Sequence, residues 1–354
     1  MTNLEKLQSR VAETADCAVI TDDVNRRYFT SMKSSAGTLV VFPECSYFII
    51  DFRYIEKARK TVTSCDVILQ DRLYEQINAL INRHNAKSVA VNSDTCTLSE
   101  LLAYQKKLNA EVKTDNKLAD IIRNIRVIKS QEEIDKIITA QRIAEKGFEH
   151  MLDYICEGRT EREIQLELDY FMLSNGAEAL SFDTIALSGK NTSLPHGVPS
   201  DKKIESGDFV LLDYGAVYDG WHSDMTRTIC VGKPSDEMKL VYNTVLKAQL
   251  AALQAVKAGI SGKMFDRIAR DIISDAGFGE CFGHSLGHGV GMEIHESPYA
   301  SPSMEDILEE NSIVTVEPGI YIEDEFGVRI EDFVVVTKGG CINMTKAPKE
   351  LICL

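Results

Sequence analysis

Short apolar runs alternate with segments of helical spacing along the first third of the chain. Each run is rich in Val, Ile or aromatic residues, which is typical of strands that are buried in a sheet. The runs lie at residues 18–20, 38–42, 47–51, 67–69 and 88–91. Strands separated by helical segments predict a mixed α/β domain at this end of the chain.

A long helical pattern opens the second part of the chain. Ser130 and Glu133 have the spacing of a capping box, and apolar residues follow at helical intervals from Ile134. We expect the boundary just before this helix, with one domain at residues 1–122 and another at 123–354.

A further helix is expected at residues 160–175 and ends at Gly176. After this helix the pattern of the second domain changes from helical segments to a mixture of strands and helices. Two more helical patterns lie between apolar runs that read as strands. The strands are expected at 210–213, 226–231, 313–316 and 333–336, and the helices at 235–258 and 262–277. This order predicts an α+β domain.

Composition agrees with a folded protein and excludes several functions. The chain has 354 residues, of which 44% are hydrophobic and 26% charged, as in ordinary globular proteins. A net charge of −15 opposes binding to nucleic acid or to an anionic membrane. The start of the chain lacks an apolar targeting segment, so we expect a cytoplasmic protein, with its nine cysteines reduced.

Acidic residues stand where the strands of the second domain should be apolar. They are Asp213, Asp224, Glu317 and Glu331. Any one of them could be exposed at a strand end or paired with Lys or Arg. Four carboxylates buried together would repel one another unless cations lay between them, so the set indicates a metal site.

Three histidines lie close together in a glycine-rich segment, residues 283–295. A lone histidine is usually structural, but His284, His288 and His295 stand among glycines that allow the backbone to approach a ligand. Four carboxylates and one imidazole form a hard set of donors, which suits Mn²⁺ or a similar first-row ion. A zinc site rich in cysteine ligands is not indicated. Two such ions could hold a bridging hydroxide at neutral pH.

These residues, in this order and context, resemble the "pita-bread" metallopeptidases of family M24, which include aminopeptidase P, prolidase and methionine aminopeptidase. The phrases that carry the resemblance are Leu-Asp-Tyr-Gly-Ala at 212–216, Ser-Asp-Met-Thr-Arg-Thr at 223–228, Gly-His-Gly-Val-Gly at 287–291, Val-Glu-Pro-Gly-Ile-Tyr at 316–321 and Arg-Ile-Glu-Asp at 329–332. Asn-Arg-Arg-Tyr-Phe-Thr at 25–30 and the segment 38–54 look like the creatinase-type N-terminal domain of the proline-specific branch. The resemblance implies a creatinase-like α/β domain followed by a pita-bread catalytic domain.

The resemblance also implies roles for the matching residues. Two divalent ions, Mn²⁺ first and Co²⁺ or Zn²⁺ as alternatives, would be held by Asp213, Asp224, His288, Glu317 and Glu331, with Asp224 and Glu331 bridging. Glu317 would also carry a proton from the metal-bound water to the leaving proline nitrogen.

Other matching residues would act on the substrate. His196, His284 and His295 would line the cleft, and His284 and His295 would hydrogen-bond the substrate and the developing oxyanion. His196 could instead be a turn residue beside Pro195. Arg329 lies two residues before Glu331, on the same face of a strand, and would orient a ligand carboxylate.

The expected activity is that of an Xaa-Pro aminopeptidase, which removes the residue before a proline at the N-terminus of a peptide. The alternative is an Xaa-Pro dipeptidase (prolidase). Members of the prolidase branch have an arginine in the loop after the histidine that corresponds to His295, and this arginine holds the C-terminal carboxylate of the dipeptide. Residues 296–316 contain neither Arg nor Lys. The N-terminal domain or a partner subunit could still supply that charge.

Two other classes of the same fold are disfavoured. Creatinase and the non-catalytic binding modules lack the five metal ligands, and all five are present here. The resemblance further implies a homodimer.

Overall fold

The computed structural model describes residues 1–354 as two compact units, Met1–Arg126 and Val127–Leu354. The division falls at 126/127 rather than at the expected 122/123, inside helix α6 (Lys117–Val127). Ile121, Ile122 and Ile125 of α6 are buried, and the Ile125 carbonyl accepts a hydrogen bond from the Tyr28 hydroxyl. Almost all of α6 therefore belongs to the first unit.

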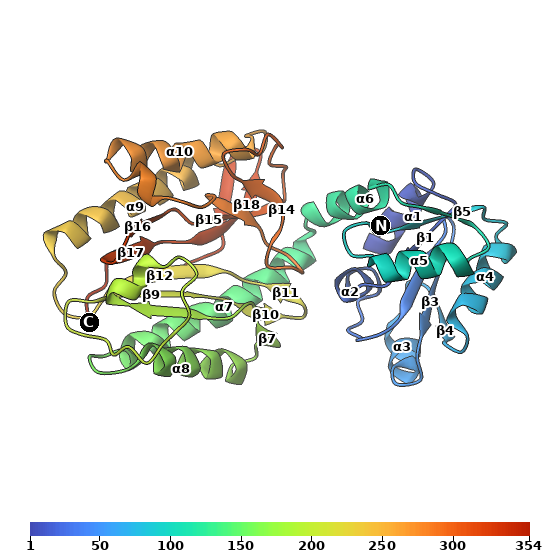
Figure 1. Ribbon diagram of the computed structural model, residues 1–354, viewed down its shortest axis with the longest axis horizontal. Helices are drawn as coiled ribbons and strands as arrows, with labels where there is room; N and C mark the ends of the chain where they lie inside the picture. The colour runs from blue at the N-terminus through green and yellow to red at the C-terminus, as the bar shows by residue number, and fades with distance from the viewer. The chain divides into compact units, whose positions relative to one another are not determined.

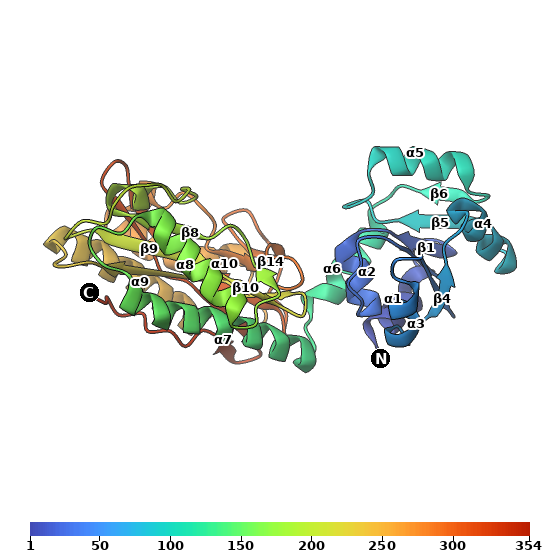
Figure 2. The same ribbon diagram turned by 90° about the horizontal axis from the view of Figure 1, so that it is seen from below.

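The first unit is a mixed sheet with the strand order β4-β3-β2-β1-β5-β6. Its strands are β1 (Cys17–Ile20), β2 (Thr38–Val41), β3 (Ser46–Ile50), β4 (Asp66–Leu69), β5 (Ser88–Val91) and β6 (Glu111–Lys113). Its other helices are α1 (Asn3–Val11), α2 (Asp23–Thr30), α3 (Ile55–Thr61), α4 (Leu73–Arg83) and α5 (Leu98–Lys107). Every residue of β1, β2 and β3 is buried, so both faces of the sheet centre are covered, as their continuous apolar sequences predict. Figures 1 and 2 show the helices around this sheet.

The second unit contains four long helices and several small antiparallel sheets. The helices are α7 (Gln131–Tyr154), α8 (Glu161–Ser174), α9 (Asp236–Ala255) and α10 (Gly262–Asp275), with short 3₁₀ turns η1 (Gly189–Ser193) and η2 (Gly279–Cys281). The strands are β7 (Ala179–Leu180), β8 (Ile185–Ser188), β9 (Phe209–Tyr214), β10 (Ala216–Tyr218), β11 (Trp221–His222), β12 (Met225–Cys230), β13 (Gly287–Gly289), β14 (Glu296–Ala300), β15 (Ile313–Val316), β16 (Gly319–Ile322), β17 (Phe326–Arg329), β18 (Asp332–Thr337) and β19 (Gly340–Asn343). No helix of the chain is both long and apolar enough to cross a bilayer.

Two hydrophobic cores divide this unit into halves, each made of a helix pair on strands. In the first, Phe148 of α7 and Leu168 of α8 share a core with Leu212 of β9. In the second, α9 and α10 cover β15 and β18, with Phe265 and Val334 buried in one cluster. Figure 1 shows the helix pairs at opposite edges of the unit and the strands between them. Strand ends from both halves therefore meet in the middle.

Helix starts follow the local sequence closely. The Ser130 side chain accepts from the backbone of Glu133, and the Glu133 carboxylate accepts from the backbone of Ser130, so the expected capping box opens α7. Thr160 and Glu163 form the same motif at α8. These caps fix where both helices of the first half begin.

Candidate active site

Strands of both halves deliver the acidic residues and the histidine to one place. Asp213 lies on β9, and Asp224 lies in the link between β11 and β12. From the other half, His288 lies on β13, Glu317 directly follows β15, and Glu331 separates β17 from β18. All five side chains line a single cavity of about 760 Å³. The structure thus brings together every residue that the sequence proposed as a metal ligand.

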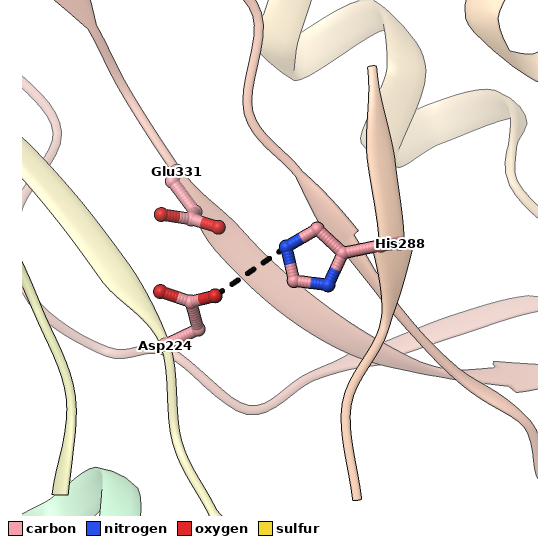
Figure 3. A group of neighbouring side chains, drawn as sticks. All are labelled: Asp224, His288 and Glu331. Atoms are coloured by element: carbon pink, nitrogen blue, oxygen red, sulfur yellow. Dashed lines mark ion pairs between the residues drawn. The ribbon is translucent and has the colours of Figure 1, made fainter. Parts of the chain in front are cut away.

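The centre of the cluster consists of Asp224, His288 and Glu331, whose side chains point toward one another (Figure 3). One oxygen or nitrogen from each lies within 4.8 Å of the others. The His288 Nε2 atom is 3.6 Å from Asp224 Oδ2 and 3.3 Å from Glu317 Oε1. Three carboxyl groups therefore converge on one imidazole nitrogen, a donor set that could hold a divalent cation.

Burial makes this convergence costly without a cation. Asp224 is 4% exposed and Glu331 is 1% exposed. Desolvation, followed by repulsion from neighbouring carboxylates, raises the pKa of both groups well above the ordinary range. Burial likewise raises the pKa of Glu317 to about 8, and burial lowers the pKa of His288 to about 4. A bound divalent ion would offset this penalty by stabilising the carboxylates in charged form.

The only permanent positive charge inside the cluster is Arg329, which is buried and holds Asp213 in place. One guanidinium nitrogen donates to Asp213 Oδ2. The other carboxylate oxygen of Asp213, Oδ1, is buried and has no hydrogen-bond partner. A buried carboxylate oxygen without a partner is rare in proteins and is a ready ligand for a metal ion. Arg329 therefore contacts one of the proposed metal ligands, and its orienting function stays a prediction.

His284 belongs to a hydrogen-bonded chain that the sequence did not reveal. Arg329 Nη1 donates to the Tyr321 hydroxyl at 2.7 Å, and that hydroxyl is 2.9 Å from His284 Nε2. The other ring nitrogen, Nδ1, is 2.8 Å from the Ser285 carbonyl oxygen. Because a carbonyl only accepts, Nδ1 carries the proton and Nε2 accepts from Tyr321. Both nitrogens of His284 are therefore engaged with the protein.

His295 and His196 are placed differently, on the exposed wall of the same cavity. The ring of His295 packs edge to face against His288, with centroids 4.3 Å apart. His196 lies in the loop after η1, beside Pro195, and its side chain also lines the cavity. These two imidazoles are accessible to a ligand in a way that His284 is not.

Threonines hold the carboxylates from behind. Thr226 on β12 donates to Glu331 Oε2 at 2.8 Å and accepts from Arg329 Nε at 3.1 Å. Thr315 on β15 donates to Glu317 Oε1 at 3.0 Å. Thr226 lies two residues after Asp224, and Thr315 lies two residues before Glu317. This spacing is the feature of the sequence from which the two threonines could have been predicted as partners of the carboxylates.

A glycine explains how the strands come so close. A β-carbon at Gly287 on β13 would overlap the carbonyl group of Thr315 on β15. The glycine is therefore required by the neighbouring strand, whereas the sequence suggested close approach to a ligand.

A buried ion pair supports the segment that carries His295. The Lys129 ammonium, which has no exposed surface, donates to Glu296 Oε1 at 2.6 Å. Glu296 begins β14 directly after His295, and its carboxylate leaves no room for a side chain at Gly291. The Lys129 backbone N–H also donates to the Asn311 carbonyl. This pair ties the link before α7 to the histidine segment, and the sequence gave no sign of it.

Comparison with known proteins gives the same picture along the whole chain. Residues 135–338 match the model of metallopeptidase family M24, and residues 4–128 match that of the creatinase/prolidase N-terminal domain. The Xaa-Pro dipeptidase of Pyrococcus furiosus is 40% identical over 352 residues, covering 99% of both chains.

Solved structures agree in fold. The Xaa-Pro dipeptidase from Bacillus anthracis has a TM-score of 0.96 and 41% identity, with 99% of each chain covered. The X-Pro aminopeptidase from Thermotoga maritima has a TM-score of 0.90 and 35% identity, covering 96% of this chain and 98% of that one. A creatinase-type domain followed by a pita-bread domain, as the sequence predicts, is thus confirmed.

Proposed function

The chain belongs to metallopeptidase family M24, and from this premise we propose that it is an Xaa-Pro dipeptidase, which hydrolyses a dipeptide whose second residue is proline. The observation that carries the proposal is similarity over nearly the full length to relatives named Xaa-Pro dipeptidase. This favours the alternative raised above over the aminopeptidase. The absence of Arg and Lys from residues 296–316 favoured the aminopeptidase. That absence excludes only this segment as the source of the positive charge that would bind the dipeptide carboxylate.

The residues at the site fit two divalent ions, with Mn²⁺ as the proposed metal. Asp213, Asp224, His288, Glu317 and Glu331 would hold them, through oxygen atoms and one imidazole nitrogen. Support comes from the unpartnered Asp213 Oδ1 and from the convergence of Asp224, His288 and Glu331 within 4.8 Å. When bound, the ions would lower the pKa of a water molecule and polarise the scissile carbonyl.

The protein side chains would then carry the remaining tasks. Glu317 accepts the proton of the attacking water and delivers it to the proline nitrogen, because it lies within the cluster and faces the cavity. His295 and His196, which are exposed on the wall, donate to the substrate and to the oxyanion. His284 has both nitrogens engaged, so we assign it a positioning task through Tyr321 and Arg329.

Proline itself requires a dedicated site. The nitrogen of an Xaa-Pro bond carries no hydrogen, so peptidases that hold an extended backbone by its N–H groups handle this bond poorly. The cavity offers an apolar wall for the ring, which includes Phe182, Ile185 and Ile294. The acidic cluster suits the free α-amino group at the other end of the substrate.

The test compares Ala-Pro with Ala-Ala and Ala-Pro-Ala, using protein loaded with Mn²⁺ and measuring free alanine by mass spectrometry. The proposal predicts turnover of Ala-Pro, little of Ala-Ala, and less of Ala-Pro-Ala than of Ala-Pro. Turnover of the tripeptide without the dipeptide would restore the aminopeptidase assignment. A homodimer and a cytoplasmic location stay predictions, as does the absence of nucleic-acid and membrane partners.

A further inference from the structure

A dipeptide brings a negatively charged C-terminus into a cavity whose centre is already acidic. The carboxylate therefore needs a positive group on the wall. Two permanent positive charges line this cavity, Arg162 and Arg329, and no lysine does. Within the catalytic unit, the candidates for binding the C-terminal carboxylate of the substrate are therefore these two arginines.

Arg329 is already engaged. It is 3% exposed. Its three nitrogens contact the Asp213 carboxylate, the Tyr321 hydroxyl and the Thr226 hydroxyl. Using this guanidinium for a substrate would release Asp213 and leave a metal ligand unsupported.

Arg162 is in the opposite situation. Its side chain is exposed, lines the cavity from the first turn of α8, and contacts the Gln165 amide oxygen at 2.8 Å. No carboxylate of the protein lies within ion-pair distance of its guanidinium. Of the two arginines on the cavity wall, only Arg162 is exposed and free of an ion pair.

The backbone that carries Arg162 is held firmly. The neighbouring Glu161 is 1% exposed, and its carboxylate accepts from the Ser188 backbone at 2.6 Å and from the Ser200 hydroxyl at 2.6 Å. The Arg162 N–H itself donates to the Ser200 carbonyl at 3.0 Å. Because its backbone is held in place, the Arg162 guanidinium can donate two parallel hydrogen bonds to a carboxylate.

We propose that Arg162 binds the C-terminal carboxylate of the substrate and thereby sets the preference for dipeptides. This assignment rests on the proposed dipeptidase function. Arg162 supplies a permanent positive charge to this cavity, and residues 296–316 supply none. It contributes to substrate binding and takes no part in proton transfer.

The experiment measures kcat and KM for Ala-Pro and for its C-terminal amide with four proteins: the wild type, Arg162→Ala, Arg162→Lys and Arg267→Ala. Arg267 is an exposed arginine of α10 that does not line the cavity, so its variant is the matched control. In Arg162→Ala, KM for Ala-Pro should rise about 10- to 100-fold, the value of a charge-assisted hydrogen-bond pair, with kcat nearly unchanged. KM for the amide should stay within about twofold, and Arg162→Lys should be intermediate.

The outcomes separate the two proposals. A wild type that hydrolyses Ala-Pro, with an unchanged KM in Arg162→Ala, would overturn the assignment of Arg162 and leave the dipeptidase function standing. An equal rise in KM for acid and amide would also overturn it, because the loss would then not concern the carboxylate. A wild type that fails on Ala-Pro would overturn the proposed function and this assignment together.

Discussion

Replacing Lys129 by methionine tests whether the buried ion pair with Glu296 holds the histidine segment. Methionine keeps most of the apolar stem of lysine and removes the charge. Lys129 has no exposed surface and the Glu296 side chain is 8% exposed, so the variant would leave the carboxylate charge buried without its compensating cation. Breaking such a pair from one side costs about 3–5 kcal/mol.

This cost translates into a measurable loss of thermal stability. For a unit of this size, each kcal/mol lowers Tm by about 2–4 °C, so Tm should fall by about 6–20 °C. The matched control is Lys263→Met, which removes an exposed pair with Glu305 and should change Tm by less than about 4 °C. The assay is thermal unfolding followed by circular dichroism or calorimetry.

The double variant Lys129→Met/Glu296→Gln separates charge from packing. It removes both charges, so it should recover most of the stability lost in Lys129→Met. Lys129→Met should also lower turnover, because His295 directly precedes Glu296, and the double variant should restore it. Equal Tm values for Lys129→Met and the wild type would refute the reasoning, as would a double variant that is less stable than Lys129→Met.

Three further predictions concern the site directly. Asp224→Ala should abolish hydrolysis of Ala-Pro and lower the metal content measured by elemental analysis, because one of the proposed metal ligands is lost; full activity would contradict the site assignment. EDTA should inactivate the protein and Mn²⁺ or Co²⁺ should restore it, as followed by alanine release, whereas insensitivity to both would indicate a purely structural cluster. Tyr321→Phe removes the hydroxyl that joins Arg329 to His284, so kcat should fall about three- to tenfold; an unchanged kcat would argue against the positioning task of His284.

The sequence predicted elements well where a local pattern decides them. The strands expected at 18–20, 38–42, 47–51, 67–69 and 88–91 correspond to β1 through β5, and the capping box at Ser130 opens α7. β6 was missed because Glu111–Lys113 is short and polar. β13 was missed because Gly287–Gly289 has no strand propensity, and only its pairing with β14 makes it a strand.

Residues of the site were predictable by type and context, but their partners were not. Asp213 is bound by Arg329, which is 116 positions away, and Lys129 pairs with Glu296 across 167 positions. No local periodicity reports contacts at such separations, because the packing of distant strands creates them. Tyr321 stood within a recognised phrase, yet its contact with His284 becomes visible only in the fold.

The most direct test of the central claim is a competition assay in which the Mn²⁺-loaded protein receives equal concentrations of Ala-Pro and Ala-Pro-Ala in one tube. The loss of each substrate over time gives the ratio of their kcat/KM values. An Xaa-Pro dipeptidase should consume Ala-Pro first, with a ratio of about ten or more in its favour, the value of one charge-assisted contact to the C-terminal carboxylate. Faster consumption of Ala-Pro-Ala would contradict the account and identify an aminopeptidase.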